Sequence, residues 1–106
     1  MRWFLAKVKV TTYNEVPEGG IKKVQAEDKD VAVYKVEGQI YATANVCTHE
    51  GCFIDENNEV RGDVVECTCH GSQFNIKNGE VLLPPAIEPI QSYKTEVIGE
   101  DVYVEV

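Results

Sequence analysis

Long apolar runs, basic charge and histidine are all scarce in this chain of 106 residues. No stretch approaches the roughly 18 consecutive apolar residues of a membrane helix. Residues 1–7 reach a second charge before a signal-length apolar run develops. Ten basic residues against eighteen acidic ones give a formal net charge of −8, which disfavours binding to nucleic acid and to anionic membranes. We therefore expect a cytoplasmic protein with no membrane association, whose partners present basic surfaces.

The size of the chain limits it to one modest hydrophobic core. A composition of 43% hydrophobic and 26% charged residues is typical of a folded domain rather than of a disordered segment. A chain of 106 residues excludes a multi-domain enzyme with separate substrate and nucleotide sites. Residues 1–106 are therefore expected to form a single domain.

The pattern of apolar residues predicts an all-β chain. No segment carries a sustained apolar period of about 3.6 residues between helix-capping signals, whereas β-branched and aromatic residues alternate with polar ones. Hairpin turns are predicted at Glu37-Gly38 and at Asn78-Gly79, because such pairs favour short connections between strands. Strands are expected at residues 3–10, 31–36, 39–45, 74–77, 80–83, 93–97 and 102–106.

The middle of the chain differs from its ends in composition. Residues 47–74 contain six acidic residues but a single basic one, Arg61, and they are rich in turn-forming residues. This segment predicts a small lobe, about residues 45–86, mounted on a β-sheet base. The proline-rich stretch at residues 82–86 is stiff, because proline fixes the backbone angle φ and lacks an amide hydrogen. It forms either an ordinary turn or a loop that shields the lobe.

All four cysteines and both histidines lie between positions 47 and 70, which indicates a metal or redox centre. Two motifs hold them: Cys47-Thr48-His49-Glu50-Gly51-Cys52 and Cys67-Thr68-Cys69-His70-Gly71-Ser72-Gln73-Phe74. Thiolate and imidazole ligands together suit zinc or an iron–sulfur centre. Zinc would take four ligands around one ion, whereas a 2Fe–2S centre can place two cysteines on one iron and two histidines on the other.

Both motifs resemble those of the Rieske family, which have the forms C-x-H and C-x-x-H, the second followed by glycine and an aromatic residue. They are also similar to the subset with an extra cysteine in each loop, and the resemblance extends over nearly all of the chain. It implies a soluble Rieske-type ferredoxin that holds one 2Fe–2S cluster. The implied fold is all-β, a Rieske-like antiparallel β-sandwich base into which a small cluster-binding lobe is inserted.

The resemblance also implies a role for each cysteine and histidine. Cys47 and Cys67 are expected to bind the inner iron, His49 and His70 to bind the outer iron, and Cys52 and Cys69 to form a disulfide. A bridge across a loop of this size restricts the unfolded chain and contributes about 3 kcal/mol to stability. We therefore expect the bridge to hold together two loops that have few apolar residues.

Ser72 and Phe74 bear on the expected reduction potential. In high-potential relatives a serine at the position of Ser72 donates its hydroxyl to a bridging sulfide, and a tyrosine stands where this chain has Phe74. One of two hydroxyl donors that stabilise the reduced state is therefore absent. We expect a potential between those of oxygenase ferredoxins and respiratory Rieske proteins, within the family span of roughly −150 to +300 mV.

Electron transfer, not catalysis, is the function that these residues and the resemblance imply. Both histidines are assigned to the cluster, so no Ser-His-Asp set and no separate iron site with two histidines can form. The expected role is a one-electron carrier between a flavin-dependent reductase and a non-haem iron oxygenase or a similar terminal oxidoreductase. Two alternatives stay open, namely the soluble part of a respiratory-type Rieske protein and a small zinc-binding module.

Overall fold

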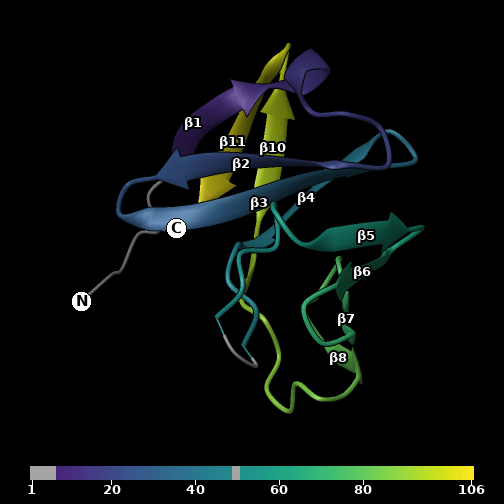
Figure 1. Ribbon diagram of the computed structural model, residues 1–106. Coiled ribbons are helices and arrows are strands. Elements are labelled where there is room, and N and C mark those ends of the chain that lie inside the picture. The colour runs from purple at the N-terminus through teal and green to yellow at the C-terminus, as the bar shows by residue number, and fades with distance from the viewer. Residues whose placement is uncertain (1–6, 49–50) are drawn as a thin grey trace.

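Three small antiparallel sheets form the chain (Figure 1), and the computed structural model describes residues 7–48 and 51–106. The first sheet has the order β1 (Lys7–Thr12), β11 (Asp101–Glu105), β10 (Thr95–Ile98). The second has the order β2 (Ile21–Ala26), β3 (Lys29–Val36), β4 (Gln39–Ala44), β9 (Ser92–Tyr93). The third has the order β5 (Asn58–Arg61), β6 (Val64–Cys67), β7 (Ser72–Asn75), β8 (Val81–Leu83). The helical structure of the described residues is one 3-10 turn, η1 (Tyr13–Glu15), so the expected all-β fold class is confirmed.

Both predicted hairpins form, but with different turns. Glu37 and Gly38, between β3 and β4, have φ angles of 51° and 78°, the two positive values that a two-residue type I′ turn requires. The hairpin of β7 and β8 is joined by residues 76–80 rather than by two residues. Asn75 closes this longer turn, since its side-chain oxygen accepts a hydrogen bond from Lys77 N–H (2.8 Å) and its carbonyl accepts one from Gly79 N–H (2.7 Å).

The strand predicted at residues 93–97 divides at Lys94. Its first part is β9, which pairs with β4 in the second sheet, and its second part is β10, which pairs with β11 in the first. The Lys94 carbonyl accepts a hydrogen bond from Glu105 N–H (2.9 Å), so the chain changes sheets at this residue. A regular apolar alternation across residues 93–97 hides this change of partner.

Strand β3, in the second sheet, is buried on both faces. One face points to the first sheet and the other to the lobe. Val31 and Val33 face a cluster that includes Val102 and Val104 of β11. The alternate residues Ala32, Tyr34 and Val36 face a second cluster, which also contains Phe74 and the two buried cysteines of the lobe. Because successive strand residues point to opposite faces, one strand joins both cores. Figure 1 shows the resulting layers, with the first sheet on one side of β2–β4 and the β5–β8 lobe on the other.

The predicted core tyrosines differ in burial. Tyr34 is fully buried, and its hydroxyl lies 2.8 Å from the Thr43 hydroxyl, whereas Tyr41 and Tyr93 are half-buried. Trp3 and the start of the predicted opening strand lie outside the described residues. Among the residues that the structure describes, no helix has the length and apolar character needed to cross a bilayer.

Candidate metal centre

The two cysteine–histidine motifs form loops with the same backbone turn. In the first loop Gly51 N–H donates to the Cys47 carbonyl (3.0 Å), and in the second Gly71 N–H donates to the Cys67 carbonyl (2.9 Å). Both glycines have positive φ angles, 76° and 88°, and among the described residues no heavy atom beyond the chain neighbours lies within 4 Å of a Cβ added to either. Glycine is therefore required for the backbone angle rather than for space. Each loop begins with its cysteine and turns back within five residues.

Cys47 and Cys67 are free thiols in the core of the lobe. Their exposed fractions are only 4% and 2%. Burial raises the pKa of the Cys67 thiol, and the neighbouring Cys47 thiol raises it further, while a hydrogen bond from the Cys69 backbone opposes the change. The two sulfurs are thus direct neighbours in an apolar site. Cysteine binds a metal as the thiolate, so a cation bound here would supply the charge that compensates for burying the two sulfurs.

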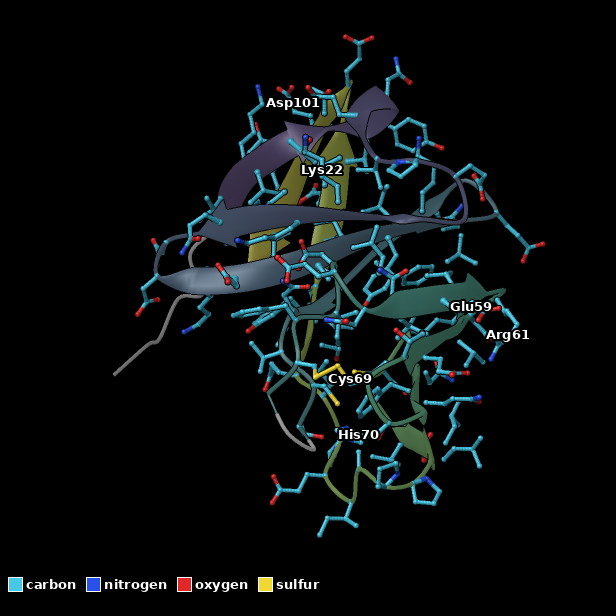
Figure 2. All side chains as sticks on the ribbon, in the orientation of Figure 1. Lys22, Glu59, Arg61, Cys69, His70 and Asp101 are labelled. Carbon is cyan, nitrogen blue, oxygen red and sulfur yellow. A yellow bond between two sulfur atoms is a disulfide. The ribbon has the colours of Figure 1, made fainter. Side chains whose placement is uncertain are left out.

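Cys52 and Cys69 form a disulfide that joins the two loops (Figure 2). Their Cα atoms are 6.7 Å apart, and 17 residues separate them in the chain. The Cys67 sulfur lies beside this bridge, since the sulfurs of Cys52, Cys67 and Cys69 are all within 4.8 Å of one another. This pairing is the one that the family resemblance implied. It leaves Cys47 and Cys67 as the cysteines available to a metal.

His70 lies at the exposed end of the lobe, far from Lys22 and Asp101 at the other end of the molecule (Figure 2). The second predicted histidine ligand, His49, lies outside the described residues. The described part of the site therefore has a buried side with two thiols and a solvent-facing side with an imidazole.

Ser72, the first residue of β7, is 1% exposed, and its Oγ accepts a hydrogen bond from Ala86 N–H (3.0 Å). A hydroxyl has one proton and two lone pairs, so the Ser72 O–H is still able to donate. The sequence predicted the donor role alone. The contact with Ala86 adds a second role, because it attaches the proline-rich segment to the second cysteine loop.

The proline-rich segment, residues 84–90, is also attached to the first cysteine loop and to the β7–β8 turn. Thr48 Oγ1 donates to the Glu88 carbonyl (2.8 Å), and Ile90 N–H donates to the Gly79 carbonyl (2.8 Å). A Cβ on Gly79 would lie 1.8 Å from the Ile90 carbonyl oxygen, so this turn requires glycine. With the serine contact, three hydrogen bonds fix the segment. Of the stretch predicted at residues 82–86, the first two residues belong to β8, and the rest begin a loop that packs on the lobe, in agreement with the second predicted alternative.

Ile87 projects from the middle of this fixed segment and is 88% exposed. Its neighbours Ala86 and Ile90 are each 2% exposed, which shows how the backbone is held while this one side chain points outward. The segment thus displays one large apolar side chain on a backbone that three hydrogen bonds fix. Sequence reasoning missed Ile87, although the prolines on both sides of it were a usable signal.

The donor set fits a 2Fe–2S cluster. Two adjacent buried thiols could bind one iron on the buried side, and the exposed imidazole of His70 could bind the other iron on the solvent side. A structural zinc ion would instead require sulfur and nitrogen donors to converge on one point at 2.0–2.3 Å. The asymmetry between the buried and exposed sides is typical of the arrangement in which cysteines bind one iron and histidines bind the other.

Comparison with known proteins agrees with this donor set. The Rieske [2Fe-2S] domain matches residues 6–94. The chain is 36% identical over 97 residues to the biphenyl dioxygenase ferredoxin subunit of Pseudomonas sp. (strain KKS102), covering 92% of this chain and 89% of that protein. It is also 36% identical to the ferredoxin component of the naphthalene 1,2-dioxygenase system of Pseudomonas aeruginosa, covering 86% of each.

A solved structure gives the same result. One chain of the complex of reduced oxygenase and oxidized ferredoxin in carbazole 1,9a-dioxygenase superposes with a TM-score of 0.86 at 34% identity. The match covers 93% of this chain and 92% of that chain.

Proposed function

This chain belongs to the Rieske [2Fe-2S] domain family, and from that premise we propose that it carries single electrons from a flavin-dependent reductase to a non-haem iron terminal oxygenase. The one 2Fe–2S cluster of the domain supplies the redox chemistry by accepting and releasing one electron when bound. The chain is an electron carrier rather than an enzyme, like the ferredoxin components that it resembles. The observation that carries the proposal is a lobe with two buried thiols and an exposed His70.

The proposal assigns Cys47 and Cys67 to the inner iron and His49 and His70 to the outer iron. The buried thiols exclude water from one side of the cluster, which favours tight binding. The exposed imidazole of His70 provides the edge through which an electron passes to a docked partner. The disulfide between Cys52 and Cys69 holds the two loops at a constant separation.

The proposal also includes a single domain over residues 1–106, with the cluster-binding lobe at about residues 45–86. Support for this division comes from the third sheet and the disulfide, which both lie within the lobe. We also propose that the protein functions in the cytoplasm. A cytoplasmic disulfide is unusual, because thiols there are normally kept reduced, so this bridge must resist reduction to persist.

The surface that contacts a partner is proposed to combine His70 with the fixed segment at residues 84–90. Ile87 offers an apolar side chain that loses little conformational freedom on docking, because its loop is already held by three hydrogen bonds. The net charge of −8 adds long-range attraction to basic partner surfaces. Electron transfer is therefore expected to combine a salt-sensitive approach with a short-range apolar contact.

The test is single-electron transfer to the terminal oxygenase of a biphenyl or naphthalene dioxygenase system. The reduced, cluster-loaded chain is mixed anaerobically with the oxidised oxygenase, and visible absorbance follows its re-oxidation. We expect the rate to saturate with oxygenase concentration and to fall as salt is added, because exposed charges are screened. Ile87→Asp is expected to raise the half-saturating concentration roughly 10- to 30-fold, as loss of a buried interface anchor does.

Ile98→Asp is the matched control for this experiment. Ile98 is also exposed, at 51%, but it lies at the end of β10 in the base. Its replacement is expected to leave the half-saturating concentration unchanged. Equal effects of the two substitutions would remove Ile87 from the docking surface, and a chain that is never re-oxidised by the oxygenase would refute the carrier role.

Ser72 provides a prediction about the reduction potential. Ser72→Ala removes the buried hydroxyl that we assign as a donor to the cluster, and such a bond favours the more negative reduced state. Loss of a charge-assisted hydrogen bond to the reduced cluster is expected to lower the potential by something on the order of 100 mV for one electron. Redox titration of the loaded chain, followed by its visible or EPR spectrum, measures the change.

Thr48→Val is the control that separates hydroxyl donation from movement of the proline-rich segment. It deletes the Thr48 contact with Glu88, just as Ser72→Ala deletes the contact with Ala86. If the potential depends on the Ser72 hydroxyl, only Ser72→Ala lowers it substantially. Equal decreases in both variants would mean that the segment's position, and not a hydroxyl donor, sets the potential.

A further inference from the structure

A groove lies where β4, β9 and the end of β11 come together, and Lys77 of the β7–β8 turn also lines it. Its volume is about 850 Å³, and Lys29, Lys77 and Lys94 line it together with Tyr41 and Tyr93. A second hollow of about 460 Å³ adjoins it toward the lobe, and Gln91 and Ser92 line both. His70, at the exposed end of the lobe in Figure 2, does not line this groove.

Three lysines converge on this groove from distant parts of the chain. Lys29 begins β3, Lys77 lies in the β7–β8 turn, and Lys94 lies between β9 and β10. In a chain with ten basic and eighteen acidic residues, such a gathering of positive charge is conspicuous. Glu105 also lines the groove, so the lining side chains carry three positive charges and one negative charge.

Lys94 makes no ion pair with any carboxylate of the described residues. The other two lysines are paired only loosely. Lys29 Nζ lies 3.7 Å from an Asp28 oxygen, and Lys77 Nζ lies 4.0 Å from an Asp63 oxygen. Exposed ion pairs of this kind contribute little to the stability of the fold. A ligand carboxylate can therefore replace Asp28 or Asp63 as the partner of these lysines with little loss of stability.

The shape of the groove favours an extended ligand. Tyr41 pairs in register with Tyr34, which lies five positions after Lys29 in β3, and five steps along a strand correspond to about 17 Å. A small aromatic acid would reach one end of this groove and leave the distant lysines unused. A peptide segment of about five extended residues matches the distance.

The side chains that line the groove suit a peptide that has both acidic and apolar side chains. Lys77 Nζ lies 6.0 Å from the centre of the Tyr41 ring, so one wall combines an aromatic face with a positive charge. Tyr93 is half-buried on β9, and β9 pairs only with β4 within the described parts of the chain. Tyrosine faces accept an apolar side chain, while lysines accept carboxylates.

We propose that this groove binds an extended acidic segment of a protein partner, about five residues long, with carboxylates on the lysines and an apolar side chain on the tyrosines. The proposal goes beyond the proposed function. It gives the carrier a second contact site that holds a partner while the His70 face remains accessible.

The test uses the cluster-loaded, oxidised, ¹⁵N-labelled chain and a blocked pentapeptide of four glutamates around one phenylalanine. We expect saturable shifts of the amide signals of Lys94, Thr95 and Glu105, and no shifts with the same peptide carrying glutamines. Lys94→Glu is expected to raise the Kd at least tenfold. Lys23→Glu is the matched control, because it makes the same charge change on β2, outside the groove, and it is expected to change the Kd no more than twofold.

Several outcomes would overturn the proposal. These are the absence of saturable shifts, equal effects of Lys94→Glu and Lys23→Glu, saturable binding of benzoate at these residues without peptide binding, and concentration-dependent dimerisation through them. Iron content and the EPR spectrum are measured on the same Lys94→Glu sample and are expected to match those of the wild type. A failure of peptide binding is therefore distinguishable from a failure of the electron-carrier proposal.

Discussion

Cys67→Ser is expected to abolish cluster binding and to lower the iron and acid-labile sulfide content by more than about 100-fold. Loss of a residue that only hydrogen-bonds to a metal ligand already lowers metal affinity by about 10- to 100-fold, and Cys67 is assigned as a ligand itself. The Cys67 sulfur is 2% exposed and lies beside the Cys47 thiol in the core of the lobe. Serine at this position replaces a thiolate ligand by a buried hydroxyl, which is a poor ligand for iron. Metal analysis and the visible spectrum of purified protein measure the effect.

The matched control is the double substitution Cys52→Ala and Cys69→Ala. It also removes two sulfurs from the lobe, and both lie within 4.8 Å of the Cys67 sulfur. If the ligands are Cys47 and Cys67, this control still incorporates iron and sulfide. Full iron content in Cys67→Ser, together with loss of iron in the control, would show that the bridge cysteines are the ligands and would refute the assignment.

The same double substitution is expected to lower the free energy of unfolding by about 3 kcal/mol, because the bridge closes a loop with a sequence separation of 17 residues. For a domain of this size the thermal midpoint should fall by roughly 15 °C. The effect should be concentrated in the lobe, since the bridge joins the two cysteine loops there. Circular dichroism measures unfolding of the whole chain, and visible absorbance measures loss of the cluster.

Wild-type protein treated with a strong reductant is the control for the stability experiment. If the bridge alone is responsible, the reduced wild type and the double variant should unfold at the same temperature. The disulfide would have no stabilising role if neither reduction nor substitution moved the midpoint. A decrease in the variant without a decrease on reduction would assign the effect to packing of the substituted side chains.

The chemistry of the lobe could be predicted because its information is local. Thiolate and imidazole groups a few residues apart limit the possible metals, and Gly51 and Gly71 belong to the same short motifs. The hairpin at Glu37-Gly38 was predictable for the same reason, because a two-residue turn needs particular backbone angles at adjacent positions. In each case the residues that interact are neighbours in the chain.

Strands β2, β5 and β6 were not predicted, and their sequences explain why. β2 reads Ile-Lys-Lys-Val-Gln-Ala and has only partial alternation, and β5 and β6 have four residues each. They become strands because neighbouring strands offer hydrogen-bonding edges, β3 for β2 and β7 for β6. Short strands depend more on their neighbours than on their own residues.

From the amino-acid order alone one can read the ligand types, the acidic surface and the all-β character, since these depend on residue chemistry and short spacing. Folding in three dimensions settles the contacts between remote segments. Ala86 meets Ser72 across 14 residues, and Thr48 meets Glu88 across 40. Lys29, Lys77 and Lys94 share a groove only because β4, β9 and β11 bring three distant segments together. No local sequence pattern encodes these long-range contacts, because the free energy that stabilises them comes from packing of the whole chain.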